Sequence, residues 1–328
     1  MPRFRLTLEY AGTRYSGWQI QKNARTVQGE LERAAREISA GRAFDLYGSG
    51  RTDAGVHALH QVAHLDLETA LDPGALLVEL NDRLPADINI LSIERVSHRF
   101  HARHGAVARS YLYQISRRRT AFAKPFVWWV RDPLDIAAMR AAAVHFVGFQ
   151  DFRFFTDDEP GEKSTRVLLE RLDIGEDGDF ILLRVLGSHF LWKMVRRMVG
   201  VLVEVGRGRL SAGDLERLLG QPSGLPASLT APPSGLFLER VLYEGERWEA
   251  PLRAVMSVSS GRPTATGETT APAVPRGAGR ERRRSRGRSP RLGLTSGRWP
   301  RGRAARPGCG RPAARVKCPR AARPRSGR

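Results

Sequence analysis

Apolar and polar positions in the first hundred residues follow the periods of strands and helices in turn. Residues 4–10 alternate apolar and polar side chains, which predicts a strand with one buried face. Residues 27–38 carry apolar side chains at helical spacing, with Thr26 suited to cap this helix and Gly41 suited to end it. The same reasoning predicts strands over 43–47, 61–67 and 88–96, and a helix opened by Asp72 and Pro73. The predicted order is β-α-β-β-α-β.

The second half shows a similar order of patterns. Alternation from near Ser110 predicts a strand, and residues 166–185 predict a hairpin around an Asp-Gly turn. Asp135 can cap a helix, and apolar pairs that recur every four residues predict a long helix over about 188–205. A final strand is predicted over 235–242.

These patterns predict an α+β protein built from two ferredoxin-like β-α-β-β-α-β halves, at residues 1–104 and 105–248. The halves are expected to form one mixed or antiparallel sheet, or two sheets joined edge to edge, with the helices on one side. A central cleft between the halves is the expected place for a ligand. Ferredoxin-like folds serve many unrelated functions, so the architecture by itself names no chemistry.

The net charge of +20 comes almost entirely from the end of the sequence. Residues 251–328 hold 21 Lys and Arg and two acidic residues, which leaves 33 basic and 32 acidic residues in 1–250. Arg, Ala, Gly, Pro and Ser dominate this segment, so we expect a disordered basic tail over residues 249–328. The tail has three interpretations: an Arg-rich RNA-binding arm, a solvated extension of no fixed role, or the product of a reading-frame or gene-boundary error.

Cysteine use and hydropathy narrow the class of protein. Both cysteines, Cys309 and Cys318, lie in the tail without nearby histidines, which predicts neither a zinc site nor a disulfide framework. The sequence enters a strand pattern at once, without the apolar core of a signal peptide. No apolar run approaches the roughly 18 residues that a membrane span requires. We therefore expect a soluble, cytoplasmic protein with no membrane contact.

The glycine-rich segment 48–58, Gly-Ser-Gly-Arg-Thr-Asp-Ala-Gly-Val-His-Ala, carries the candidate chemistry. Glycines let a backbone approach a ligand closely. Arg51 beside Asp53 favours the ionised carboxylate, which is the form that acts as a nucleophile or base. The alternative is an aspartate that only forms a turn. The segment has neither the Gly-Lys-Ser/Thr ending of a Walker loop nor the spacing of a dinucleotide-binding motif.

The histidines and aspartates around this segment raise two alternatives, a metal site and a glycoside hydrolase. One histidine, His57, lies in this segment, and two more, His60 and His64, follow it closely. They run from a loop into a strand, share no helix face and have no carboxylate cluster beside them, so no metal site is expected. A glycoside hydrolase would use two carboxylates, and Asp45 and Asp66 lie near Asp53 in the sequence, so that class stays open on spacing alone.

Five further segments, together with residues 48–58, resemble the signature of the TruA family of tRNA pseudouridine synthases. They are Gly17-Trp18-Gln19, Phe100-His101-Ala102-Arg103, residues 108–113 (Ala-Arg-Ser-Tyr-Leu-Tyr), residues 190–196 (Phe-Leu-Trp-Lys-Met-Val-Arg) and residues 235–238 (Gly-Leu-Phe-Leu). The match keeps the same order over about residues 3–245. The resemblance implies isomerisation of uridines 38, 39 and 40 in the anticodon stem-loop of tRNA, by a homodimer that uses no cofactor or metal.

The resemblance also implies a role for five residues. The aspartate that matches Asp53 is the catalytic residue of the family. Tyr111 matches a tyrosine that stacks on the base and is the candidate for the final proton transfer, and Arg196 matches the arginine that pairs with the catalytic carboxylate. Arg51 matches the residue thought to displace the target base, and Leu236 an apolar residue of the uracil pocket. From the residues alone, Tyr111 and Leu236 also fit a core role, and Arg196 a solvated charge.

Binding of tRNA requires a positively charged surface. Because residues 1–250 are nearly neutral overall, their basic side chains must be concentrated on one surface. We expect phosphate contacts in a central RNA-binding cleft, which make binding sensitive to salt. The candidate residues are Arg14, Lys22, Arg51, Arg103, Arg109 and Arg196. The alternative function is a non-catalytic RNA-binding protein, because ferredoxin-like sheets can stack bases on aromatic side chains. An Asp53→Ala variant separates the two, since only the isomerase should lose turnover while it keeps its RNA affinity.

Overall fold

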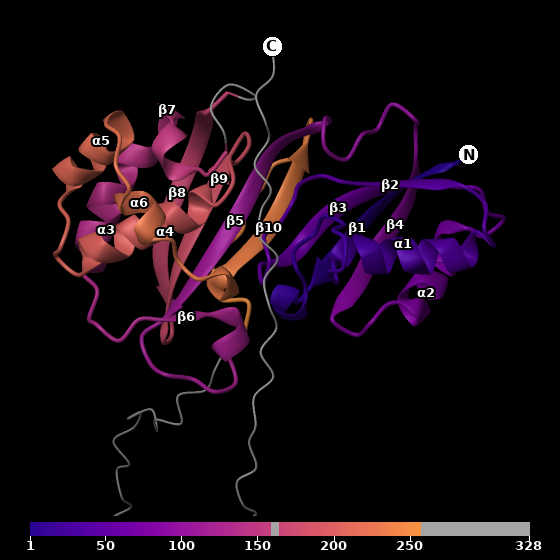
Figure 1. The fold of residues 1–328 in the computed structure, drawn as a ribbon, viewed down its shortest axis with the longest axis horizontal. Coiled ribbons are helices and arrows are strands. Elements are labelled where there is room, and N and C mark those ends of the chain that lie inside the picture. Colours follow the sequence, from indigo (N-terminus) through magenta and orange to yellow (C-terminus); the bar gives the residue numbers. More distant parts are fainter. Residues whose placement is uncertain (159–163, 257–328) are drawn as a thin grey trace, which may run out of the picture. The chain divides into compact units, whose positions relative to one another are not determined.

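The computed structural model describes residues 1–158 and 164–256, so most of the predicted tail lies outside the described residues. The described residues belong to one compact unit. Its framework is a ten-stranded sheet, in which a single path runs β4-β1-β3-β10-β5-β9-β8-β7, while β2 pairs with β3 and β6 with β5 beside this path (Figure 1).

The first half has the predicted order of elements. They are β1 (Arg3–Tyr10), α1 (Val27–Ile38), β2 (Phe44–Gly48), β3 (His57–Leu67), α2 (Pro73–Arg83) and β4 (Ile88–Val96). β1 lies between β3 and β4, and β2 pairs with β3, all antiparallel. Both predicted caps are present: the Thr26 hydroxyl accepts from the Gly29 amide at 3.2 Å, and Asp72 accepts from the Gly74 and Ala75 amides.

The second half repeats this four-strand arrangement and adds elements that the patterns did not predict. The strands are β5 (Ala106–Ser116), β6 (Trp128–Trp129), β7 (Gly148–Asp151), β8 (Arg166–Asp177), β9 (Phe180–Gly187) and β10 (Leu236–Tyr243). The helices are α3 (Ile136–Ala143), α4 (Met194–Gly206), α5 (Ala212–Gly220) and α6 (Leu225–Ser228). Short 3-10 turns are η1 (Gly12–Arg14), η2 (Lys124–Phe126), η3 (Val144–Phe146), η4 (Arg153–Phe155) and η5 (Pro233–Gly235). β6, β7, α5 and α6 are the additions.

The two halves join through β3 and β10. Residues 63–67 of β3 pair with β2, whereas His57 and Ala58 at its other end pair in parallel with Phe237 and Leu238 of β10. β2 and β10 therefore both pair with β3, but at different points along its length. The glycine-rich loop connects β2 to β3 and so lies at this junction.

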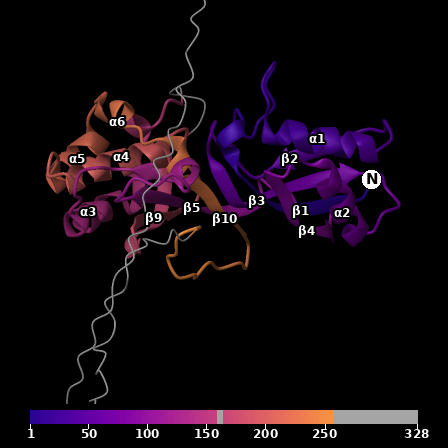
Figure 2. The ribbon, with the colours of Figure 1, turned by 90° about the horizontal axis from the view of Figure 1, so that it is seen from below.

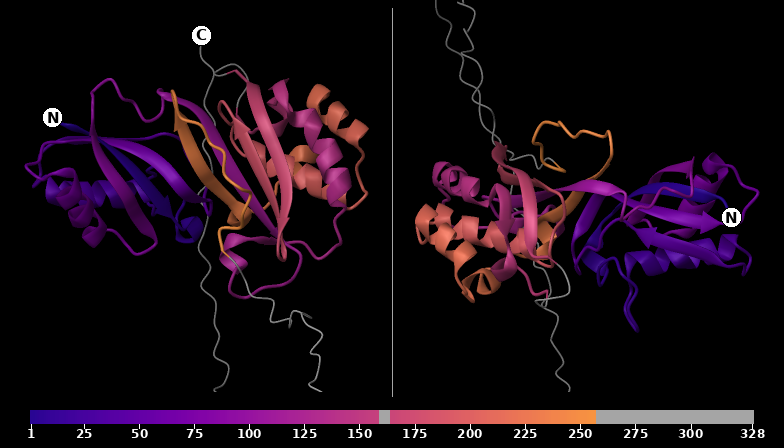
Figure 3. Two further views of the ribbon diagram at one scale, coloured as in Figure 1. Left: turned by 180° about the vertical axis from the view of Figure 1, so that it is seen from behind. Right: turned by 90° about the horizontal axis from the view of Figure 1, so that it is seen from above.

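The helices cover one face of the sheet, and the segment after β10, residues 249–256, covers part of the other face (Figures 2 and 3). Two adjacent residues of β5 point to opposite faces of the sheet. Tyr113 belongs to the core beneath the helices of the second half, while Leu112 packs in the cluster that contains Leu252 on the other face. Arg184 and Glu239 form a buried pair, and Arg184 also donates to the carbonyl oxygens of residues 250 and 251. The predicted α+β architecture with helices on one side is confirmed, and residues 249–256, assigned to the tail by composition, pack on the sheet.

The long helix of the second half begins later than its apolar pattern predicts. It starts at Met194 rather than near Ser188, because Lys193 has a left-handed backbone with φ of 62°. A left-handed residue interrupts a right-handed helix. Asp157 accepts from Lys193 Nζ at 2.7 Å, and Asp158 accepts from the Trp192 amide at 2.9 Å, so both contacts hold the turn in place.

Candidate active site

Asp53 lies in the loop between β2 and β3, against the segment that leads from β1 into α1. The Trp18 amide donates to the Thr52 carbonyl at 3.0 Å. A Cβ atom at Gly17 would lie 2.5 Å from that carbonyl, and one at Gly48 would lie 2.5 Å from the Trp18 ring. Glycine is required at both positions because the two segments pack in direct contact.

The Asp53 carboxylate meets the Arg196 guanidinium from the other half of the molecule. Arg196 Nη1 donates to Asp53 Oδ2 at 3.1 Å, between residues 143 positions apart in the chain. The Asp53 side chain is 25% exposed and that of Arg196 is 14% exposed. Such a charge-assisted hydrogen bond fixes the carboxylate more firmly than a fully solvated ion pair would. The carboxylate is thus oriented and still open to a ligand.

Arg196 is itself held by a segment that the sequence patterns did not single out. Its Nε donates to the Ala231 carbonyl at 2.7 Å, and the Ala231 amide donates back to the Arg196 carbonyl at 3.0 Å. A Cβ atom at Gly200, one turn further along α4, would lie 1.7 Å from the Leu229 carbonyl oxygen. The glycine in the helix was the available signal of this close approach.

Tyr111 lies on β5, between β9 and β10, and packs against the cores of both halves. Its ring meets the Phe190 ring edge to face, with centroids 5.0 Å apart. Burial raises the pKa of Tyr111 to about 12, an effect that the Asp53 charge increases and the Arg109 charge opposes. The phenol is therefore protonated at neutral pH.

Arg51 and Leu236 have different surroundings. Arg51 is exposed, and its Nε donates to Gln19 Oε1 at 3.1 Å rather than to the neighbouring Asp53. Leu236 begins β10, opposite Tyr113 of β5, and is 6% exposed within the core beneath the helices of the second half.

The candidate RNA-binding residues fall into two groups. Arg14, Lys22, Arg51 and Arg103 are exposed. Arg109 is partly buried, and its guanidinium donates to four carbonyl oxygens, those of Ser49, Arg103, Ala106 and Ser188. Arg109 therefore ties the glycine-rich loop to the second half, while Arg196 is paired with Asp53.

Two of the three histidines that were weighed as metal ligands, His57 and His64, have structural partners. His57 Nδ1 accepts from the Gly12 amide at 3.0 Å, so its Nε2 carries the proton that is donated to the Pro125 carbonyl at 3.0 Å. His64 Nδ1 accepts from the Ala102 amide at 3.1 Å. Across residues 1–158 and 164–256, no group of three or more His, Cys, Asp or Glu side chains could hold a metal ion. No helix within these ranges is long and apolar enough to cross a membrane.

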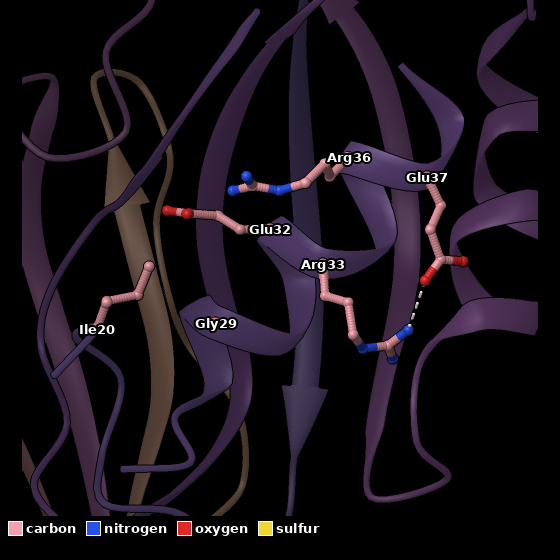
Figure 4. Close-up of a pocket in the computed structure, with 6 residues that line it drawn as sticks. All are labelled: Ile20, Gly29, Glu32, Arg33, Arg36 and Glu37. Carbon is pink, nitrogen blue, oxygen red and sulfur yellow. Dashed lines mark hydrogen bonds and ion pairs between the residues drawn. The ribbon is translucent and has the colours of Figure 1, made fainter. Parts of the chain in front are cut away.

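A surface hollow of about 530 Å³ lies on α1, and none of the predicted site residues lines it (Figure 4). It is lined by Ile20, Gly29, Glu32, Arg33, Arg36 and Glu37. Arg33 pairs with Glu37 at 3.0 Å on the surface of this helix. None of the residues that surround Asp53 lines this hollow, so the hollow does not mark the candidate site. The candidate site is instead defined by the contacts that Asp53 makes between the two halves.

Comparison with known proteins identifies the class. A family model described as tRNA pseudouridine synthase matches residues 7–104 and 142–244. The chain belongs to the tRNA pseudouridine synthase family, whose members are isomerases that convert uridine to pseudouridine in tRNA, as the sequence resemblance predicts.

Individual relatives carry the name tRNA pseudouridine synthase A. The chain is 47% identical to the protein of Rhodopseudomonas palustris strain BisA53 over 247 residues, which are 74% of this chain and 100% of the relative. It is 45% identical to the protein of Nitrobacter hamburgensis, over 74% of this chain and 100% of the relative. For the protein of Brucella ovis, the identity is 42% over 74% of this chain and 98% of the relative.

Proposed function

We propose that the protein converts uridine to pseudouridine at positions 38, 39 and 40 of the tRNA anticodon stem-loop, with Asp53 as the catalytic carboxylate. The Asp53–Arg196 contact at 3.1 Å carries the proposal, because it joins the glycine-rich loop of one half to a helix of the other. A carboxylate that is held in place and one-quarter exposed can reach a bound nucleotide. Family membership favours this enzyme over a non-catalytic RNA-binding protein.

The reaction rearranges bonds without adding or removing atoms overall. The N1–C1′ bond breaks, the detached uracil turns, C5 bonds to C1′, and the C5 proton is lost while N1 gains one. In this proposal Asp53 either attacks C1′ or removes a sugar proton to give a glycal, and either route uses a carboxylate in its ionised form. Arg196 keeps that carboxylate directed toward the sugar.

Tyr111 is the proposed partner of the base. Its ring stacks on the uracil, and its phenol takes part in the final proton transfer from C5. Since burial raises the pKa of Tyr111 to about 12, the phenol must pass its own proton to another group before it can act as a base. The edge-to-face contact with Phe190 holds the ring in place for stacking.

Arg51 and Leu236 complete the proposed handling of the nucleotide. A uridine in a paired stem must leave the stack, at a cost of roughly a few kcal/mol. The exposed Arg51 guanidinium, held by Gln19, fills the vacated space, because a planar cation stacks well on bases. Leu236 lines the uracil pocket beside Tyr111.

We further propose a homodimer that acts in the cytoplasm and binds one tRNA across both subunits. Two copies would extend the surface that the exposed basic residues offer to tRNA phosphates. Light scattering of the protein with and without tRNA measures the dimer directly, and a monomer in both samples contradicts it.

Tritium release from tRNA labelled at uridine C5 tests the reaction, because pseudouridine has the same mass as uridine. We expect wild type to release tritium, and Asp53→Ala to bind the same tRNA without release. Asp45→Ala, which removes an exposed aspartate of β2, is the matched control and should retain turnover. Release that persists in Asp53→Ala would overturn the assignment of the catalytic residue. Separate tRNA substrates that carry a single uridine, at position 38, 39 or 40, test which positions the enzyme modifies.

A further inference from the structure

A buried glutamine lies directly beneath the glycine-rich loop. Gln61, on β3, has no exposed surface. A buried carboxamide is costly unless its donors and acceptor are satisfied. Here Ser49 Oγ donates to Gln61 Oε1 at 2.6 Å, and Gln61 Nε2 donates to the Gly50 carbonyl at 3.0 Å. The Gly50 carbonyl can only accept, so the amide nitrogen must face it and the orientation of the carboxamide is settled.

The same amide begins a chain of hydroxyl groups that ends beside Asp53. Gln61 Nε2 also donates to the Tyr10 hydroxyl, at the longer distance of 3.4 Å. The Tyr10 hydroxyl is in turn hydrogen-bonded to Thr52 Oγ1 at 2.8 Å, and either hydroxyl group can be the donor of this bond. Thr52 immediately precedes Asp53, so the network reaches three of the four residues before it.

We infer that Gln61, acting through Tyr10, is a positioning residue that holds the glycine-rich loop so that Asp53 meets Arg196. This inference rests on the proposed role of Asp53. The loop contains glycines, and its other contacts include the bond from Arg109 to the Ser49 carbonyl at 3.4 Å and backbone bonds such as Ser49 N to the Val62 carbonyl at 2.7 Å. Arg196 is fixed separately on α4, so the distance between the pair depends on where β1 and β3 hold the loop.

The test replaces Gln61 with methionine, which keeps the length of the side chain and removes its hydrogen bonds. We expect kcat to fall roughly 10- to 100-fold, since displacement of a catalytic group by about 1 Å can cost about 100-fold. The dissociation constant for tRNA should change by less than about threefold, because no phosphate contact is removed. Tyr10→Phe should lower kcat less, and the double variant should lose less than the product of the two single effects, because both side chains belong to one network.

Gln114 supplies the matched control. It is a second glutamine with no exposed surface, on β5, and its carboxamide bonds the Phe126 carbonyl and the Val255 amide at 3.0 and 2.7 Å. Gln114→Met should lower the unfolding midpoint as Gln61→Met does but leave kcat of the folded enzyme unchanged. Equal loss of kcat in both variants, or none in Gln61→Met, overturns the inference. Wild type and Asp53→Ala run in the same assay show separately whether the proposed reaction itself fails.

Discussion

At the scale of single residues, Arg196 performs two tasks with one side chain. Its Nε bonds the Ala231 carbonyl while its Nη1 bonds Asp53. A guanidinium can make both contacts because its donors are fixed in one plane and point in different directions. The carboxylate is therefore tied to the backbone of residue 231 through the arginine, which positions it more narrowly than a charge on a flexible stem could.

Arg196→Lys tests this division of tasks. Lysine keeps the charge, but its single ammonium cannot replace both contacts, so we expect kcat/KM to fall roughly 100-fold, as for loss of a positioned catalytic contact. Single-turnover kinetics and tRNA binding should show that the loss lies in the chemical step. Arg197→Lys is the control, because this buried neighbour pairs with Asp157 instead of Asp53. Equal losses in the two variants would contradict the assignment.

The candidate residues were predictable from the sequence to different degrees. The segment 48–58 singles out Asp53 by its composition, but no spacing rule connects it to an arginine 143 positions later. That pairing was predicted only through the family resemblance. Ala231 was not predicted, because its contribution is a backbone carbonyl and any residue has one.

At the scale of elements, the packing of α4 sets the position of Arg196. Gly200 lets the helix approach the Leu229 carbonyl, and the same connecting segment bonds Arg196 two residues later. A helix glycine normally costs up to about 1 kcal/mol relative to alanine. Close packing against the segment after α6 accounts for its presence here.

Gly200→Ala is therefore expected to destabilise the protein, although alanine is the better helix former. A Cβ atom 1.7 Å from the Leu229 oxygen forces the helix and the segment apart. We expect a loss of about 1–3 kcal/mol in the free energy of unfolding, with reduced turnover because Arg196 moves. Gly220→Ala at the end of α5, where the new methyl group meets open space, should be close to neutral. Urea unfolding of both variants measures the difference, and a stabilised Gly200→Ala would contradict the packing argument.

Local signals located most elements but not their irregular ends. The Thr26, Asp72 and Asp135 caps were predicted because a side-chain oxygen before an apolar pattern has a local effect. The start of α4 was predicted six residues early, since the left-handed Lys193 is held by Asp157, which is remote in sequence. α5 was missed although Ser211 and Asp214 form a capping box that the sequence displays.

At the scale of the whole molecule, His57 connects the two halves. Its ring bonds Gly12 and the Pro125 carbonyl and stacks against Phe237, at a centroid distance of 4.8 Å. Burial lowers the pKa of His57 to about 4, and likewise that of His64. The neutral ring is thus part of the folded state, and protonation works against it.

Stability should therefore depend on pH in a defined direction. Between the ordinary histidine pKa of about 6.5 and the folded value of about 4, the unfolded chain binds more protons than the folded one, so stability is lost as the pH falls. We expect the free energy of unfolding to decline from pH 6.5 toward pH 4 in wild type, and to decline less steeply in His57→Asn. Urea titrations at several pH values measure both slopes. Parallel curves for the two proteins would show that His57 does not contribute.

The order of the strands also determines when during synthesis the two halves can join. β10, the last strand in the part of the chain that the structure describes, lies in the middle of the sheet between β3 and β5. The four strands of the first half are complete by Val96, so that half can assemble while the ribosome is still making the rest. β3 and β5 gain their shared neighbour only after residues 236–243 have left the exit tunnel. A nascent chain can thus hold Asp53 in a folded half before the strand that joins this half to the other one has emerged.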